Sequence, residues 1–467
     1  MNANRRLLQY LRLTPFGADT EAHRTAERYR LAALGAVATI ASRLTGIGLI
    51  LLTVRWAAPQ LGPERFGVWA TFSGLATTLT FLDLGVGNAL VNRIAHATAS
   101  GDSHRLTSVL MGGIGWLVAI GSAASIVLVT ASAWVPWTTL FKLSSSVSGD
   151  ETLTAALVFS VLFGLNIIST GGLKILVGQQ RSYEAQLISM LAALLAYPAT
   201  WLALRQGNSV GLLLAAGLGT QSILIISMVL SLLAKRGLLA VRRLAVSMRE
   251  ERNNLLSTGA LFLIVQIGTA IGWGSDTLFL AGIAGATDVA AFAVAQRLFL
   301  FAFQPVAILN GSLWAAYSDA HARDDRDFIR NTLRGSVALS VSVGGGLSIL
   351  LLFFGARLAS FWTESTIDVP WTLLAAFAFW TPLEAAGTAV AYYLNGTGIV
   401  REQMVVVLAF CALALPAKVL ATLHAGATGL VAATALAYAV SHFGLYGTVY
   451  RRRILAPLRR DGELPVP

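Results

Sequence analysis

Long apolar runs separated by short polar loops dominate the chain. A helix needs about 20 apolar residues to cross a hydrocarbon core, and about twelve runs are long enough. Backbone groups inside a bilayer must be paired within their own segment, and no alternating strand pattern occurs, so the runs predict transmembrane helices. Their predicted limits are 31–56, 66–90, 107–131, 153–176, 185–204, 209–233, 258–284, 291–315, 332–356, 371–396, 404–424 and 427–449.

One long polar link divides these runs into two equal sets. It is basic, and Leu238, Val241, Ala245 and Met248 recur in it at helical spacing, which predicts an amphipathic helix on the inner leaflet. We therefore expect an all-α polytopic membrane protein with two six-helix lobes related by a parallel pseudo-repeat. The predicted parts are a basic N-terminal segment at 1–30, an N-lobe at 31–234, the linker at 235–257, a C-lobe at 258–450 and a basic tail at 451–467.

The distribution of charge predicts the topology. Only 12% of the 467 residues are charged, about half the fraction of a soluble domain. Most of the 34 lysines and arginines fall on the side of the two termini, so both termini are expected in the cytoplasm. The few basic residues assigned to the outer side include Lys142, Arg205 and Lys418. Basic loops beside apolar spans indicate contact with anionic membrane lipids, and no nucleic-acid partner is expected.

Three charges inside predicted spans are candidates for function. A central arginine costs about 2.5–3.5 kcal/mol on insertion scales. At about 1.5 Å per residue, Arg43 lies about 18 Å and Arg297 about 21 Å from the inner side of a ~30 Å core. Asp276 reaches a similar depth. These positions predict a cationic cavity between the lobes in which Asp276 pairs with Arg297, with a purely structural clamp as the alternative.

Other polar residues follow the same helix faces. The predicted substrate-binding set contains polar and aromatic side chains near the two arginines: Arg43, Arg297, Gln266, Trp273 and Gln304. Candidates for ion coupling or charge pairing are Asp276, Glu384 and Asp83. Glu384 follows Pro382 and could instead cap a kink, and Asp83 lies in an Asp-Leu-Gly-Val-Gly stretch that could bend. Lys174, Arg181 and Arg93 at the inner rim are interpreted as topology signals or as a first capture site for an anionic headgroup.

Motifs of catalysis and cofactor binding are missing from the sequence. It contains no Walker motif, no metal-ligand spacing and no nucleophile elbow. We therefore predict no catalytic residue, no metal and no cofactor, and not an enzyme. The single cysteine, Cys411, excludes an internal disulfide.

Several short motifs resemble one transporter family. They are Gly62-Pro63-Glu64-x-Phe66-Gly67, Asp83-Leu-Gly85-x-Gly87, Gly101-Asp102 and the stretch from Leu313 to Ala320. Together they resemble those of bacterial polysaccharide and O-antigen flippases, the oligosaccharide-lipid transporters of the multidrug/oligosaccharidyl-lipid/polysaccharide exporter superfamily.

The resemblance implies a function. The protein would carry a polyprenyl-pyrophosphate-linked oligosaccharide from the inner to the outer leaflet of the bacterial inner membrane, by alternating access, for lipopolysaccharide or exopolysaccharide synthesis. A polysaccharide polymerase and a chain-length regulator would be its partners.

Two other functions stay open. A cation-coupled multidrug or organic-cation antiporter of the same superfamily would need an acidic, aromatic cavity. A membrane glycan polymerase or ligase would need a catalytic loop outside the spans, and the longest outer loop, 132–152, has few acidic, basic or nucleophilic residues. A non-transporting scaffold would gain nothing from charges inside the membrane.

Overall fold

In the computed structural model, the described part of the chain contains helices and no strands. Nine helical segments among the described residues are long and apolar enough to cross a membrane. The predicted all-α polytopic class is therefore confirmed. The described residues are 21–78, 83–99, 102–144, 147–179, 181–207, 209–239, 241–253, 255, 272, 274–322 and 324–449.

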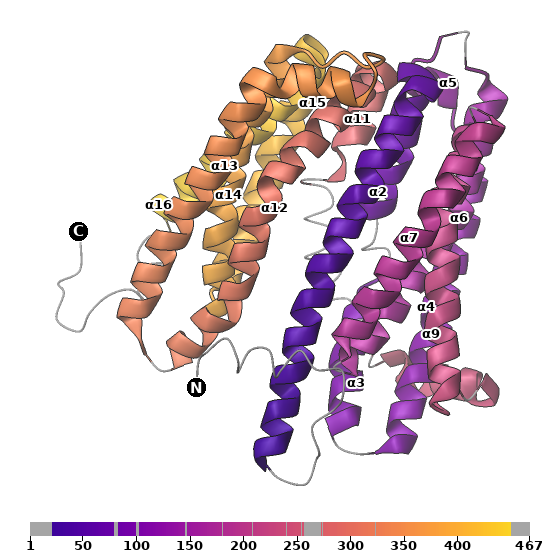
Figure 1. Ribbon diagram of the computed structural model, residues 1–467, viewed down its shortest axis with the longest axis vertical. Helices are drawn as coiled ribbons and strands as arrows, with labels where there is room; N and C mark the ends of the chain where they lie inside the picture. The colour runs from indigo at the N-terminus through magenta and orange to yellow at the C-terminus, as the bar shows by residue number, and fades with distance from the viewer. Residues whose placement is uncertain are drawn as a thin grey trace. The chain divides into compact units, whose positions relative to one another are not determined.

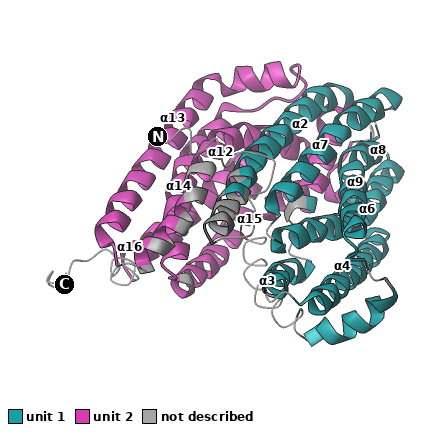
Figure 2. Ribbon diagram, turned by 60° about the horizontal axis from the view of Figure 1, so that its bottom comes forward, with its two compact units in different colours: residues 1–60, 76–137, 148–267 teal, residues 61–75, 138–147, 268–467 magenta. Residues whose placement is uncertain are grey.

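The chain forms two compact units, which Figure 2 shows in different colours. Unit 1 comprises residues 1–60, 76–137 and 148–267. Within it α4 packs along α6, and α3 packs against both. Its helices are the first part of α2 (Glu21–Thr78), α3 (Val86–Ala99), α4 (Ser103–Ser132), α6 (Gly149–Gly178), α7 (Ser182–Gln206), α8 (Val210–Leu214), the π-helix η2 (Ala215–Gly219), α9 (Thr220–Lys235) and the short 3-10 helix η3 (Val241–Arg243).

Unit 2 comprises residues 61–75, 138–147 and 268–467. In it α12, α13 and α14 pack against one another (Figure 1). Two segments that precede the linker, 61–75 and 138–147, belong to this unit, whereas the predicted N-lobe included them. Its helices are the last part of α2, α5 (Trp137–Leu140), α11 (Asp276–Ile283), α12 (Ala286–Ala322), α13 (Arg326–Trp362), α14 (Trp371–Gly396), α15 (Val400–Tyr438), the π-helix η5 (Ala439–Gly444) and α16 (Leu445–Gly447).

Two of the long helices contain a sharp break. In α2 the backbone of Gly62 has φ 70°, and in α15 that of Gly426 has φ 53°. Glycine adopts these left-handed angles without a Cβ clash, so each break divides two successive helices. The breaks fall between predicted spans, 31–56 and 66–90 in α2 and 404–424 and 427–449 in α15.

Polar residues in the loops define where other helices begin. The carboxylate of Asp102 accepts a hydrogen bond from the Arg105 amide at 2.9 Å, and that of Asp325 accepts one from the Phe328 amide at 3.1 Å. Such side chains satisfy a backbone N–H that the first turn leaves unpaired. They fix the starts of α4 and α13.

The linker belongs to unit 1 and packs within it through a helical stretch at 244–253. The Arg93 guanidinium lies 2.7 Å from the Glu251 carboxylate, and the Trp116 indole N–H donates to the Met248 carbonyl at 3.0 Å. A Cβ at Gly112 would lie only 2.7 Å from the Ser247 carbonyl oxygen, so this glycine permits the close approach. The membrane-surface position of the linker stays a prediction. The basic tail 451–467 and residues 258–271 and 273 of span 258–284 lie outside the described residues.

Candidate functional site

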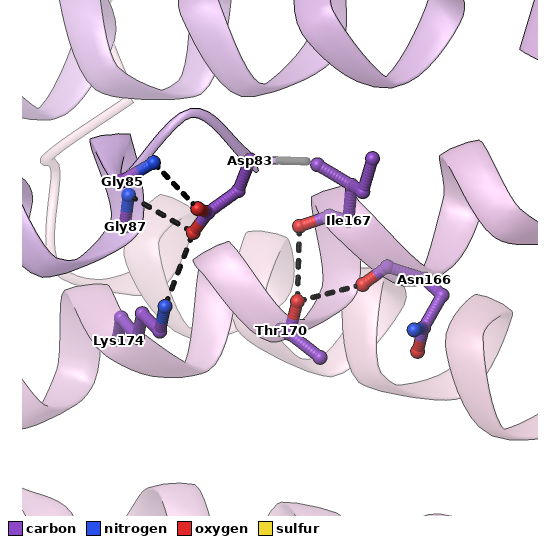
Figure 3. Close-up of polar contacts among 7 residues, drawn as sticks. All are labelled: Asp83, Gly85, Gly87, Asn166, Ile167, Thr170 and Lys174. Atoms are coloured by element: carbon purple, nitrogen blue, oxygen red, sulfur yellow. Dashed lines mark hydrogen bonds and ion pairs between the residues drawn. The ribbon is translucent and has the colours of Figure 1, made fainter. Parts of the chain in front are cut away.

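Asp83 lies in a cradle where the second predicted span is broken (Figure 3). One carboxylate oxygen accepts the Gly85 amide at 2.8 Å, and the other accepts the Gly87 amide at 3.3 Å and faces the Lys174 ammonium at 3.1 Å. Leu84 and Gly85 have positive φ, at 54° and 72°, which turns the chain from α2 into α3. The predicted bend is therefore present.

These contacts change the interpretation of two candidate residues, Asp83 and Lys174. Asp83 is only 2% exposed, and its negative charge is compensated by two amides and one ammonium. Lys174, predicted at the inner rim, instead pairs with this carboxylate from α6 and keeps 30% of its side chain exposed. The structure thus joins a predicted coupling residue to a predicted capture residue.

Polar side chains of α6 near Lys174 form hydrogen bonds to backbone carbonyls of α2 and of α6 itself. The Asn166 side-chain amide donates to the Ala76 carbonyl of α2 at 3.2 Å. The Thr170 hydroxyl donates to the Asn166 carbonyl one turn earlier, at 2.8 Å (Figure 3). These groups therefore satisfy backbone acceptors inside unit 1.

Arg297 lies half-buried in α12, inside unit 2. Its Nη1 donates to the Ala293 carbonyl at 3.0 Å, and its guanidinium carbon lies 5.3 Å from the centre of the Trp69 ring. In the described part of the chain no carboxylate pairs with it. A guanidinium has five N–H donors, so these two contacts leave donors for a further acceptor.

Asp276 has a different partner from the one predicted. Its Oδ1 lies 2.6 Å from the Lys418 ammonium of α15, which also donates to the Gly272 carbonyl at 2.7 Å. The predicted Asp276–Arg297 pair is therefore wrong. Lys418, which the sequence analysis counted among the outer basic residues, is fully buried within unit 2. Its position inside the apolar run 404–424 was the sequence signal for burial.

Glu384 on α14 lies among aromatic side chains that the sequence did not single out. It interacts with Trp380 on its own helix and with Tyr438 at the end of α15. The Tyr438 ring stacks on the His442 ring with 3.7 Å between centroids. A Cβ at Gly387 would overlap the Tyr438 hydroxyl, so this glycine admits the ring. His442 lies in the π-helix η5, a distortion common at functional sites.

The remaining substrate-site candidates are placed only in part. Arg43 is exposed on the first part of α2, in unit 1. Gln304 is half-buried on α12, two turns after Arg297. Gln266 and Trp273 lie outside the described residues. Because Arg43 and Arg297 belong to different units, their convergence on one cavity stays a prediction.

The other two inner-rim candidates are paired with carboxylates. Arg93 faces Glu251 at 2.7 Å, and Arg181 faces Glu184 at 2.5 Å. Glu184 also contacts Arg236 at 2.6 Å. An anionic headgroup captured here must compete with these carboxylates, so capture stays a prediction.

The fold defines a multi-pass helical membrane protein. A family model described as "Polysaccharide biosynthesis protein" matches residues 33–314. The match spans more than half of the chain, and the protein belongs to this family. The MatE model matches residues 262–420. No curated protein matches the chain.

Solved structures with the same fold cover nearly the whole chain. An inward-facing multidrug resistance MATE family transporter of the MOP superfamily is similar with TM-score 0.70 and 16% identity, over 91% of this chain and 100% of that chain. The lipid II flippase MurJ, in an inward closed conformation, has TM-score 0.65 and 13% identity over 91% and 90%. A MOP superfamily transporter from Pyrococcus furiosus has TM-score 0.61 and 15% identity over 92% and 97%.

These comparisons confirm the predicted superfamily and the two-lobe helical fold. The protein belongs to the polysaccharide biosynthesis family and shares its fold with MATE transporters and with a lipid II flippase.

Proposed function

We propose that the protein is a flippase for a polyprenyl-pyrophosphate-linked oligosaccharide in the bacterial inner membrane. It would move the headgroup from the inner to the outer leaflet, with both termini in the cytoplasm. Membership in a polysaccharide biosynthesis family and the fold shared with a lipid II flippase support this class of substrate. On the outer side a polymerase and a chain-length regulator would use the product for O-antigen or exopolysaccharide.

The observation that carries the proposal is the state of Arg297. It lies in an apolar helix, where a central arginine costs about 2.5–3.5 kcal/mol. Its contacts are a carbonyl and an aromatic ring, and no described carboxylate neutralises it. Phosphate oxygens take two parallel N–H donors from a guanidinium. A pyrophosphate would therefore offset the cost of this charge better than a neutral ligand.

The rest of the candidate set completes the headgroup site in this proposal. Arg43 would supply a second positive charge, while Gln304, Gln266 and Trp273 would contact the sugars. A polar headgroup cannot enter hydrocarbon unaided, because each unpaired polar group costs several kcal/mol. Rocking of the two lobes would expose the site to each leaflet in turn. Glu384 is the remaining candidate group for coupling to an ion gradient, because the Lys418 ammonium already balances Asp276.

Replacement of Arg297 tests the proposal in cells that depend on this protein for surface glycan. Charge-assisted hydrogen bonds contribute about 1.5–3 kcal/mol each, so Arg297→Ala should lower export by about 10- to 100-fold at unchanged protein level. Arg43→Ala should act in the same direction.

Arg205 provides a matched control. It also stacks on a tryptophan, with its guanidinium carbon 3.8 Å from the Trp201 ring, but it lies at the end of α7. Arg205→Ala should export normally. Wild-type export from Arg297→Ala, or an equal loss from Arg205→Ala, would contradict the proposal.

The cluster formed by Glu384, Trp380 and Tyr438 favours a second candidate function, that of a cation-coupled antiporter of organic cations. Glu384, Trp380 and Tyr438 combine a carboxylate with ring faces, which together attract organic cations. This candidate predicts energy-dependent efflux of a fluorescent organic cation, lost in Glu384→Gln and kept in Arg297→Ala. The flippase proposal predicts no such efflux.

A further inference from the structure

The surroundings of Lys418 have the composition of a cation site. Its ammonium touches the Asp276 carboxylate at 2.6 Å and the Gly272 carbonyl at 2.7 Å. The Phe410 ring lies on another side, with its centre 5.9 Å from Nζ, within the range of cation–π attraction. The lysine side chain is 0% exposed. Its charge is therefore held by a carboxylate, a carbonyl and a ring face.

The backbone beside the site is irregular. Residues 272 and 274 have π-helical geometry, Ser275 is a bend, and α11 begins at Asp276. The carbonyl and the carboxylate, one helical turn apart, therefore face the same ammonium. At membrane depth such backbone is tolerated where it is buried in protein or lines a polar site. A Cβ at Gly272 would lie 3.1 Å from Phe410, so α15 packs closely on this glycine.

We infer that Lys418 is the tethered occupant of a site for a small monovalent cation. Carboxylate and carbonyl oxygens are the ligands that hard metal ions such as sodium prefer. Here the ammonium of α15 fills that position and balances Asp276. The site of the wild-type protein consequently takes up no sodium ion, and it accepts a small cation only when the lysine side chain is removed.

The inference concerns the ion requirement of unit 2 and goes beyond the proposed substrate. The Lys418 inference is tested by the dependence of protein stability on the cation, whereas the flippase proposal is tested by glycolipid transport. Either one can therefore fail while the other holds.

Lys142 gives a matched control in the same unit. Its ammonium also donates to a backbone carbonyl, that of Ile283 at 2.6 Å, but the contact is exposed. When the Lys142 side chain is removed, water can hydrogen-bond to the exposed Ile283 carbonyl in its place. Lys142→Ala should therefore change the melting temperature equally in every salt.

The experiment compares melting temperatures of purified full-length protein in sodium chloride and in choline chloride at equal ionic strength. Wild type should melt at the same temperature in both. Lys418→Ala should melt lower in choline, and titration with sodium or methylammonium should raise its melting temperature until the shift saturates, because a ligand that binds only the folded state stabilises it. The double variant Asp276→Asn with Lys418→Ala, which lacks the carboxylate, should show no such shift.

Three results would overturn the inference. One is a sodium-specific shift in the wild type that Asp276→Asn abolishes. Another is a folded Lys418→Ala whose melting temperature is equal in all three salts. The third is a Lys418→Ala variant that fails to fold with sodium and with methylammonium alike, because small cations would then be unable to replace the ammonium.

Discussion

Removal of the Asp83 carboxylate should destabilise unit 1 more than removal of its lysine partner. Asp83→Ala deprives the Gly85 and Gly87 amides of their acceptor at the break between α2 and α3. Hydrogen bonds to charged groups are worth about 1.5–3 kcal/mol each. The ion pair adds about 0–1 kcal/mol, because Lys174 is 30% exposed and can turn to solvent. We therefore expect a loss of about 3–7 kcal/mol.

Two further variants separate the parts of this loss. Asp83→Asn keeps an oxygen acceptor for one amide and should lose less than Asp83→Ala. Lys174→Ala leaves the carboxylate bonded to both amides but takes the cation away from a buried charge, so the loss should be about 1–2 kcal/mol, more than the ion pair itself contributes. Arg181→Ala is the control, because the Arg181–Glu184 pair at 2.5 Å has an arginine that is 37% exposed. This change should cost about 0–1 kcal/mol.

Equilibrium unfolding in mixed micelles, followed by tryptophan fluorescence, measures these differences. The predicted order of destabilisation is Asp83→Ala, Asp83→Asn, Lys174→Ala, Arg181→Ala. If Lys174→Ala were as destabilising as Asp83→Ala, the amide contacts would not be the main contribution and the reasoning would be refuted. Normal stability of Asp83→Ala would refute it as well.

Two glycine contacts in unit 2 give further predictions. Gly67→Ala should destabilise by about 1–3 kcal/mol, because the new Cβ overlaps the Ala286 carbonyl. Gly46→Ala, before the break in α2, meets nothing within 4 Å and should be neutral or stabilising in thermal unfolding. Gly387→Ala should displace the Tyr438 ring and alter tyrosine and tryptophan fluorescence together with stability. Gly346→Ala, in open space on α13, should alter neither property. If Gly46→Ala were as destabilising as Gly67→Ala, or Gly346→Ala as disruptive as Gly387→Ala, the packing argument would be contradicted.

The apolar runs predicted the helices because membrane spans are set by length and composition, which a sequence states directly. The breaks were also readable: Gly62 begins a Gly-Pro-Glu turn, and Asp83 with Gly85 and Gly87 carries a short polar interruption inside a span. Only residues with special backbone angles or hydrogen bonds serve at such places.

The partners of buried charges could not be predicted in the same way. Asp276 and Lys418 are 142 residues apart in the chain, and Glu384 on α14 interacts electrostatically with Tyr438 on α15. Depth estimates place a residue along the membrane normal but not around the helix axis, so Arg297 and Lys418 were both admissible partners of Asp276. Counting basic residues by loop also missed the burial of Lys418, because its charge was taken as a topology signal.

Translocation by the purified protein is the most direct test of the central claim. Vesicles would contain the full-length protein and a polyprenyl-pyrophosphate-linked oligosaccharide carrying a labelled sugar, and a membrane-impermeant enzyme would report the label that reaches the opposite leaflet. The account predicts transfer by the wild type at a rate that Arg297→Ala lowers by about 10-fold or more and that Arg205→Ala leaves unchanged. Transfer no faster than in protein-free vesicles, or equal rates in wild type and Arg297→Ala, would contradict it.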